Sequence, residues 1–311
     1  MKKIIILLFF SLLFADSFND FKTKFIKYNS YTIDPYNNNR VTSESQGYTL
    51  YLCVKNNNQQ LFDSIWKWTK AHMQRKDNLF SWEYNKKIID KNNATDGDLF
   101  ISYSLLLAYE KWGNKQYLKN FKLISREIKK LFLPIFWNKS LNILLFPGKY
   151  GFLKDNVLQI YPSYYIPFIF KKFSRYDEFY KNVYLFTKSL YKTKDLTTKL
   201  YYDLINKVYY QGKFFNMNVY RLIPYAKIDN ENLDYLKRTF FEVNNFFNKN
   251  GFIPLTLYVN GKYKGKSPYC IYKWFYFVYK NAKYLKKFNI LKKYDKRNYF
   301  CEALDLMLKE K

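Results

Sequence analysis

A chain of 311 residues with 53 Lys and Arg but only 25 Asp and Glu has a formal charge of +28, which raises the question of an anionic partner. The basic residues are mostly Lys and are scattered among many Asn, Ile, Tyr and Phe residues, whereas nucleic-acid readers cluster their charge and use Arg at base edges. We therefore expect no nucleic-acid partner.

Histidine and cysteine usage excludes further classes of chemistry. Ser-His-Asp triads and multi-His zinc sites need histidines in defined positions, and His72 lies among Lys and Arg near the end of an expected helix, where the helix C-terminus accounts for it. Cys53, Cys270 and Cys301 have no metal-binding spacing and permit at most one disulfide, and Cys53 is interpreted as a small buried residue. With no Gly-rich phosphate loop, we expect no metal and no cofactor, so carboxylates must perform any proton transfer.

The first fifteen residues have the pattern of a secretory signal. Two lysines precede the apolar run 4–14, which is too short to span a bilayer comfortably and is followed by Ala15. Leu13 is larger than usual at the third position before a cut after Ala15, so an uncleaved anchor is the alternative. From this pattern we expect a signal peptide at 1–15 and a periplasmic or secreted protein. Because no linker or repeat follows, we expect one domain at 16–311.

Apolar residues recur at spacings of three and four through most of the chain, as at Phe62, Ile65 and Trp66, and this pattern predicts amphipathic helices. We expect helices at residues 17–28, 45–57, 59–75, 97–112, 114–131, 162–173, 176–192, 219–228, 231–248, 270–281 and 296–309.

Three segments alternate aromatic with polar residues and predict hairpins or extended loops, namely 142–160, 205–216 and 252–264. The pair Asn260-Gly261 within the last segment is a hairpin signal. Many antiparallel helices whose loops carry short hairpins predict an all-α toroid of helix pairs, with sites built from helix N-termini and loops at one end.

Two acidic segments stand out in so basic a chain. Glu44 lies in the segment 41–48, and Asp96 and Asp98 lie in 93–98, both at expected helix starts. For either segment alone, N-capping by an acid that matches the helix dipole is the alternative interpretation. A calcium loop with Gly97 at its sixth position is excluded, because Ala94 and Tyr103 would stand where acidic ligands belong.

Together, in this order and about 50 residues apart, the two segments resemble the signature of glycoside hydrolase family 8, which includes bacterial cellulose-biosynthesis endoglucanases. The second motif of that family is a small residue, Thr or Ser, Asp, Gly or Ala, and Asp, followed by a helix that ends in Trp. Here Ala94-Thr95-Asp96-Gly97-Asp98 leads to Trp112, and Ser102 replaces the usual Ala. Collinear matches over roughly residues 20–270 include Ile33-Asp34-Pro35, Phe62-Asp63, Trp68-Thr69, Ser81-Trp82, Pro147-Gly148-Lys149, Gly151-Phe152, Pro162-Ser163-Tyr164, Asn250-Gly251-Phe252, Gly265-Lys266 and Pro268.

The resemblance implies an (α/α)6 barrel that hydrolyses β-1,4 linkages with inversion, using an acid on one face of the sugar and a base-activated water on the other. By motif position Glu44 is the general acid, and its neighbours Gln46 and Tyr48 are expected to help keep the carboxyl protonated. Asp96 matches the carboxylate that contacts the sugar at the cleavage point and favours its distorted ring.

The resemblance also implies the substrate-binding residues. Trp82 and Tyr164 match aromatic positions of the cleft, where flat rings stack on the apolar faces of glucose units. Arg221 and Asp98 are the further substrate-binding candidates.

The general base is the main departure from the family. Many members have Asp in a Tyr-Asp-Ala-x-Arg segment, and the matching stretch here places Asn218, which cannot accept a proton, at that position. A register shift of two residues brings Asn216 there, with the same difficulty. One branch of the family also has Asn and takes its base from a loop elsewhere. Asp203 is therefore a candidate base, and the alternatives are Asp98, Asp229 and Glu231.

We therefore predict a monomeric, exported endo-β-1,4-glucanase that hydrolyses cellulose-type glucans, with the cellulose synthesis or export machinery as a candidate partner. Chitosan and xylan are also substrates within the family, and a strongly basic protein repels polycationic chitosan. The alternative is a glucan-binding protein that keeps the cleft and has lost its base through Asn218. A carboxylate opposite Glu44 at inverting distance would discriminate between the two.

Overall fold

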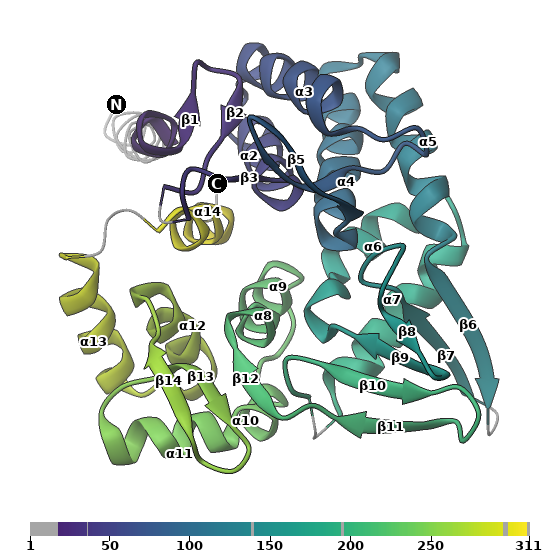
Figure 1. Ribbon diagram of the computed structural model, residues 1–311. Helices are drawn as coiled ribbons and strands as arrows, with labels where there is room; N and C mark the ends of the chain where they lie inside the picture. Colours follow the sequence, from purple (N-terminus) through teal and green to yellow (C-terminus); the bar gives the residue numbers. More distant parts are fainter. Residues whose placement is uncertain (1–17, 36, 138–139, 194–195, 295–297, 310–311) are drawn as a thin grey trace, which may run out of the picture. The chain divides into compact units, whose positions relative to one another are not determined.

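The computed structural model describes residues 18–35, 37–137, 140–193, 196–294 and 298–309, which form two compact units (Figure 1). The first unit comprises residues up to Glu127 together with the C-terminal segment from 297, and the second comprises 128–296. The predicted signal peptide at 1–15 lies outside the described residues. The prediction of one domain over 16–311 stays a prediction.

In the first unit, short strands lie next to a group of packed helices. After helical residues 18–25, its helices are α2 (Ser43–Lys55), α3 (Gln59–Met73), α4 (Thr95–Trp112), α14 (Tyr299–Leu308) and most of α5 (Lys115–Lys129). Its strands are β1 (Ile26–Lys27), β2 (Tyr31–Thr32), β3 (Val41–Thr42), β4 (Ser81–Asn85) and β5 (Lys87–Asn93). Helix α2 packs against α3, α4, α14 and β4, so it lies at the centre of this unit (Figure 1).

The second unit combines helices with hairpins. Its helices are α6 (Pro167–Phe173), α7 (Phe179–Tyr191), α8 (Met217–Tyr220), α9 (Leu222–Ile228), α10 (Leu236–Thr239), α11 (Phe241–Asn250), α12 (Tyr269–Tyr279) and α13 (Ala282–Lys292), with a 3-10 turn η1 (Pro162–Tyr164). Strands β6 (Phe132–Trp137) and β7 (Ser140–Leu145) form a hairpin. Four strands pair in the order β11 (Val208–Gln211), β10 (Leu200–Asp203), β9 (Val157–Ile160), β8 (Leu153–Lys154). Three more pair in the order β12 (Phe214–Asn216), β13 (Pro254–Tyr258), β14 (Tyr263–Lys266).

The predicted helices are present, with shifted ends and breaks at α8–α9 and α10–α11, and the Asn260-Gly261 pair lies in the turn between β13 and β14. The elements that the sequence pattern did not predict include the strands β1, β2, β3, β6 and β10, the helix α13 and the β4–β5 hairpin. Helix α13 was not predicted, because only Tyr284 and Phe288 of it are buried and its apolar stripe is narrow. The hairpin β4–β5 was not predicted, because its second strand is rich in Lys and Asn and is largely solvent-facing.

Two glycines let α2 and α4 pack closely. A Cβ at Gly97 would lie 2.4 Å from Ser43 Oγ and 2.8 Å from the amide nitrogen of Glu44. A Cβ at Gly47 would lie 2.6 Å from the Cβ of Phe100. These distances are shorter than real Cβ contacts, so neither position has room for a side chain. The first turns of α2 and α4 are therefore in direct backbone contact.

Replacing Gly97 with Ala tests this contact. Ala is the better helix former by about 1 kcal/mol, so without the steric conflict the substitution would stabilise the protein. We expect the free energy of unfolding to fall by about 2 kcal/mol instead. Urea unfolding followed by circular dichroism measures the change. Adding Ser43→Ala to Gly97→Ala removes the nearest atom, Ser43 Oγ, but leaves the Glu44 amide, so we expect the double variant to recover part of the lost stability. An unchanged unfolding midpoint for Gly97→Ala would contradict the close contact.

Ser102 gives a second test of the core. Its side chain is fully buried in α4, and its hydroxyl has no hydrogen-bond partner among the residues that the structure describes. Ser102→Ala removes an unsatisfied buried hydroxyl and is expected to raise the free energy of unfolding by about 1 kcal/mol. The matched control is Ser104→Ala in the same helix, because the Ser104 hydroxyl donates to the carbonyl of Phe100 at 2.7 Å. That control should destabilise; equal effects of the two substitutions would refute the assignment.

Candidate active site

Glu44 is held at the start of α2 by a capping box and a phenol. Thr42 caps the helix, because its Oγ1 accepts from the Ser45 amide at 3.1 Å while the Thr42 amide donates to Ser45 Oγ at 3.2 Å. One turn further along, the fully buried Tyr48 donates its hydroxyl to Glu44 Oε1 at 2.8 Å. The Glu44 carboxyl, which is half-buried, thus has a fixed orientation at a helix N-terminus.

Gln46 has a different role from the one expected. Its amide pairs with the backbone of β2: the Thr32 amide donates to Oε1 at 3.0 Å, and Nε2 donates to the Thr32 carbonyl at 2.9 Å. The Gln46 side chain therefore anchors α2 to the β1–β2 hairpin. Of the two expected neighbours, Tyr48 is the one that bonds to Glu44.

Tyr299 of α14 is a neighbour of Glu44 that the sequence analysis missed. Burial, and then the charges of Glu44 and Asp34, raise the pKa of its hydroxyl well above the usual value. Tyr299 therefore keeps its proton at neutral pH. Because α14 is distant in sequence and matches the family only loosely, no motif spacing indicated this residue.

Asp96 occupies the same position in α4 that Glu44 occupies in α2, the second residue after the N-cap. The N-cap of α4, Ala94, makes no side-chain capping bond, and Asp96 Oδ1 accepts instead from the amide of Gly97 at 2.9 Å. Asp96 is 2% exposed. The positive end of the helix dipole and the Gly97 amide are therefore directed at this carboxyl.

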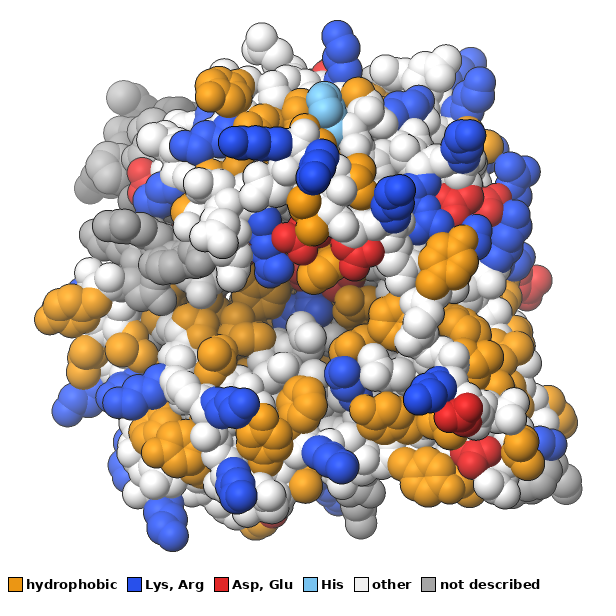
Figure 2. All heavy atoms as spheres, in the orientation of Figure 1, with side chains coloured by type: hydrophobic (Ala, Val, Ile, Leu, Met, Phe, Trp, Pro, Cys, Tyr) orange, Lys and Arg blue, Asp and Glu red, His pale blue; other side chains and the backbone are white. Residues whose placement is uncertain are grey.

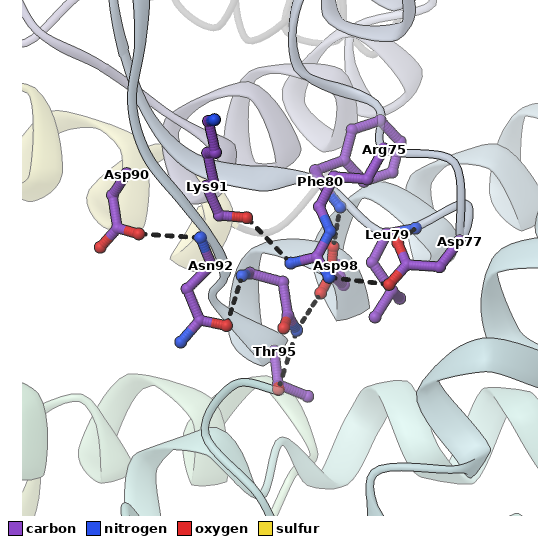
Figure 3. Close-up of polar contacts among 10 residues, drawn as sticks. Arg75, Asp77, Leu79, Phe80, Asp90, Lys91, Asn92, Thr95 and Asp98 are labelled. Atoms are coloured by element: carbon purple, nitrogen blue, oxygen red, sulfur yellow. Dashed lines mark hydrogen bonds and ion pairs between the residues drawn. The ribbon is translucent and has the colours of Figure 1, made fainter. Parts of the chain in front are cut away.

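Asp98 ties the β4–β5 hairpin to α4 (Figure 3). Its side chain is fully buried, Oδ1 accepts from the amide of Phe80 at 2.8 Å, and Oδ2 accepts from Nδ2 of Asn93 at 2.8 Å. Nearby, Arg75 donates to the carbonyl of Lys91 at 3.0 Å. Both ends of the hairpin therefore attach to one carboxyl. Substrate binding by Asp98 stays a prediction, and its buried carboxyl with both oxygens bonded has the geometry of a positioning residue.

The pKa of Asp98 is raised well above its usual value, because burial outweighs the hydrogen bonds from Asn93 and Phe80 and the attraction of Arg75, and the charge of Asp96 adds to the rise. A buried carboxyl of this kind makes stability depend on pH, since the folded state binds its proton more tightly than the unfolded state does.

Trp82 is carried by this hairpin. It is half-buried in β4, and the guanidinium of Arg40 lies 5.6 Å from its ring centroid. Across the β3–β4 pairing, Thr42, the N-cap of α2, faces Glu83. Glu83, which follows Trp82 in the chain, is thus paired with the N-cap residue of the helix that carries Glu44. The β4–β5 hairpin, which Asp98 anchors, therefore holds Trp82 in the same unit as Glu44 and Asp96.

In the second unit, three of the predicted residues come together. Arg221 is 2% exposed, its Nη2 donates to Oδ1 of Asn218 at 3.2 Å, and its guanidinium carbon lies 5.9 Å from the ring centroid of Tyr164. The amide of Asn218 donates to Oδ1 of Asn216, which caps α8. The pair Asn216 and Asn218 therefore shapes this helix start, where the family places its base.

The candidate bases have different surroundings. Asp203 lies in the β10–β11 turn, where bonds from the amide and side chain of Asn206, with a further bond from the Ile205 amide, lower the pKa of its carboxyl. Burial raises the pKa of Asp229, which lies 3.7 Å from the ammonium of Lys171.

Glu231, the remaining candidate, forms an ion pair with Lys188. Both Asp229 and Glu231 are thus paired with lysines within the second unit, whereas the Asp203 carboxylate accepts three hydrogen bonds from groups in the turn of its own hairpin.

Among the described residues, no group of three or more His, Cys, Asp and Glu side chains is placed to hold a metal ion. In that same part of the chain, no helix is long and apolar enough to cross a membrane. Cys53 is a free, fully buried thiol, as expected. On the face drawn in Figure 2, Lys and Arg side chains are spread among neutral and hydrophobic ones.

Two carboxylates at equivalent positions of adjacent helix N-termini, one of them bonded by a buried tyrosine, indicate an enzyme that uses carboxylates on a helical scaffold. Residues 7–194, more than half of the chain, match the family model described as glycosyl hydrolases family 8. The chain therefore belongs to glycosyl hydrolase family 8.

Individual relatives agree with this assignment. An endoglucanase of Cellulomonas uda is 36% identical over 151 residues, which cover 47% of this chain and 41% of the relative. An endoglucanase of Escherichia coli strain K12 is 30% identical over 171 residues, covering 51% and 46%. The matched stretch thus spans less than half the length of these relatives.

A solved structure shows the fold over nearly the whole chain. The endoglucanase from Komagataeibacter sucrofermentans superposes with a TM-score of 0.77 at 22% identity, covering 95% of this chain and 96% of the other. This similarity confirms the predicted α/α barrel fold with short hairpins.

The buried carboxyl of Asp98 predicts a pH effect on stability. Its folded pKa lies above the unfolded value of about 3.9, so the free energy of unfolding should fall as pH rises above about 4, by up to about 1.4 kcal/mol per pH unit until the folded pKa is passed. Asp98→Asn removes this contribution. Urea unfolding of both proteins from pH 4 to 8 gives the difference, and parallel curves would contradict it.

A reciprocal exchange isolates the Asp98 to Asn93 bond. Asp98→Asn alone brings two amide donors together, and Asn93→Asp alone brings two carboxylates together, so each should destabilise the fold by about 2 kcal/mol. The double variant restores one donor and one acceptor and is expected to recover most of the loss. A double variant that is no more stable than the sum of the single changes would show that this bond is not what anchors the hairpin.

Proposed function

We propose that the protein is an inverting endo-β-1,4-glucanase that hydrolyses cellulose-type glucans, with Glu44 as the general acid. The observation that carries the proposal is the pairing of Glu44 and Asp96 at the same position of two helix N-termini that touch through Gly97. The names of the relatives, which are endoglucanases, support the reaction class.

In this proposal Glu44 protonates the leaving glycosidic oxygen. The carboxylate that remains is stabilised by the hydroxyl of Tyr48 and by the positive end of α2, both already in place before the proton moves. Asp96 stays anionic and faces the positive charge that develops on the sugar ring in the oxocarbenium-like transition state. Trp82 stacks on a glucose unit and orients the chain.

We propose Asp203 as the base that activates water. An inverting enzyme needs an anionic carboxylate about 6.5–9.5 Å from the acid. Asn218 cannot serve, Asp98 is fully buried with both oxygens bonded, and Asp229 and Glu231 are paired with lysines. Asp203 has a lowered pKa, so it is anionic at neutral pH, and the hydrogen bonds to its carboxylate come from its own turn rather than from a lysine. Tyr164 and Arg221 are proposed to bind the glucan in the same unit.

The proposed substrate is cellulose rather than chitosan, since a chain with a formal charge of +28 repels a polycation. Action as a monomer in the periplasm or outside the cell, alongside the machinery that makes or exports cellulose, is proposed on the sequence pattern of residues 1–15 and the family resemblance alone.

Reducing-end release from cello-oligosaccharides and carboxymethyl cellulose tests the proposal. Glu44→Gln keeps the bond from Tyr48 and is expected to lower kcat by about a thousandfold without loss of folding. The matched control is Glu242→Gln, which changes another glutamate in a helix first turn and should leave activity unchanged. Full activity of Glu44→Gln would exclude Glu44 as the acid.

A substrate that needs no acid separates the chemical role of Glu44 from a structural one. Fluoride leaves without protonation, so a cellobiosyl fluoride should be cleaved by Glu44→Gln far better than a cello-oligosaccharide is. Proton NMR of the first product anomer distinguishes inversion from retention.

Two further variants address the base. Asp203→Asn should abolish activity if Asp203 activates water. An inert parent that becomes active with Asn218→Asp would instead identify a glucan-binding protein derived from an enzyme.

A further inference from the structure

The second unit contains a cavity of about 340 Å³ that is lined by residues of β7, the last turns of α7 and the β10–β11 hairpin. Its aromatic walls are Phe186, Tyr209 and Tyr210, and the mostly buried Leu190 and Leu200 contribute apolar surface. Cavities that hold small ligands occupy roughly 300–1,000 Å³, so this one suits a ligand of one or two sugar rings.

The nine described residues that line the cavity include no charged side chain. A quarter of the whole chain is charged, with a large excess of lysine, so a neutral lining is unexpected on this surface. The polar groups are instead amides and hydroxyls, such as those of Asn142, Ser189 and Gln211. Amides and hydroxyls beside flat rings match a neutral polyol with apolar faces, whereas an anionic ligand would lack a countercharge here.

The rings that line the cavity are held in place. The ring of Tyr209 packs edge-on against the buried Tyr202 with centroids 4.7 Å apart, and its hydroxyl donates to Oδ1 of Asn142 at 3.4 Å. Phe186 lies 5.7 Å from the ring of Tyr165, whose hydroxyl bonds to the backbone of β7. Fixed rings lose little conformational entropy when a ligand binds.

We propose that this cavity, whose described lining includes none of the residues to which hydrolysis is assigned, is a second binding site for a neutral glucan chain. Tyr209 and Phe186 stack on the apolar faces of glucose units, and Asn142 and Gln211 bond to ring hydroxyls. The choice of β-1,4-glucan as occupant rests on the proposed function, while the neutral, aromatic character of the site does not. Such a site would hold a polymer on the enzyme between cleavage events.

Affinity electrophoresis in native gels that contain neutral hydroxyethyl cellulose tests the proposal. A neutral polymer is needed because a basic protein binds carboxymethyl cellulose by charge alone. We expect Tyr209→Ala to weaken retardation by about fivefold, as the loss of one stacking ring predicts. Ser189→Trp fills the cavity from an exposed position on α7 and should have the same effect without disturbing the core.

The matched control is Tyr176→Ala, because Tyr176 is 41% exposed and Tyr209 is 40% exposed, but Tyr176 does not line the cavity. It should migrate like the parent. Hydrolysis of cellotetraose, measured separately, should be unchanged in all three variants. Parent-like retardation of Tyr209→Ala and Ser189→Trp, or a parent that is not retarded, would overturn the proposal. Retardation that depends on Tyr209 in a protein without hydrolytic activity would support this site and refute the proposed function.

Discussion

The backbone contact between α2 and α4 is the constraint on which the first unit depends. Gly47 and Gly97 permit it, and any larger side chain at either position meets atoms closer than van der Waals distance. The contact does more than fill space. It brings two helix N-termini together, so that amide groups of both helices surround one region and two acids occupy equivalent positions there. Packing and proposed chemistry therefore share the same two glycines.

Much of this arrangement was readable from the sequence. Helix periodicity predicted the helices that bury a broad apolar face. The predicted starts of α2 and α4, next to the two acidic motifs, were correct to within two residues. Helix α13 was missed because two buried rings in a lysine-rich segment leave too narrow a stripe for a pattern to detect. The β4–β5 hairpin was missed because its stability comes from Asp98 and Asn93, that is, from tertiary hydrogen bonds rather than local propensity.

In the candidate active site, too, the sequence predicted some features and missed others. Spacing located Glu44, Asp96 and Asp98, but it did not indicate that the Asp98 carboxyl fixes a hairpin. Asp96 and Asp98 belong to one motif and differ in their hydrogen-bond partners. Spacing also did not indicate Tyr299, because a residue near the end of the chain reaches Glu44 only through the fold. Roles that depend on neighbours distant in sequence need the three-dimensional structure.

The Tyr48 hydroxyl that bonds to Glu44 and the Gly97 amide that bonds to Asp96 are fixed dipoles and not mobile ions. Dissolved salt screens interactions between exposed charges over about 8–10 Å at physiological strength, but it acts weakly on fixed dipoles at hydrogen-bond distance. The basic surface and these two hydrogen bonds therefore respond differently to ionic strength. A change in the salinity of the surroundings would alter the attraction between this protein and charged polymers more than it would alter the bonds from Tyr48 and Gly97.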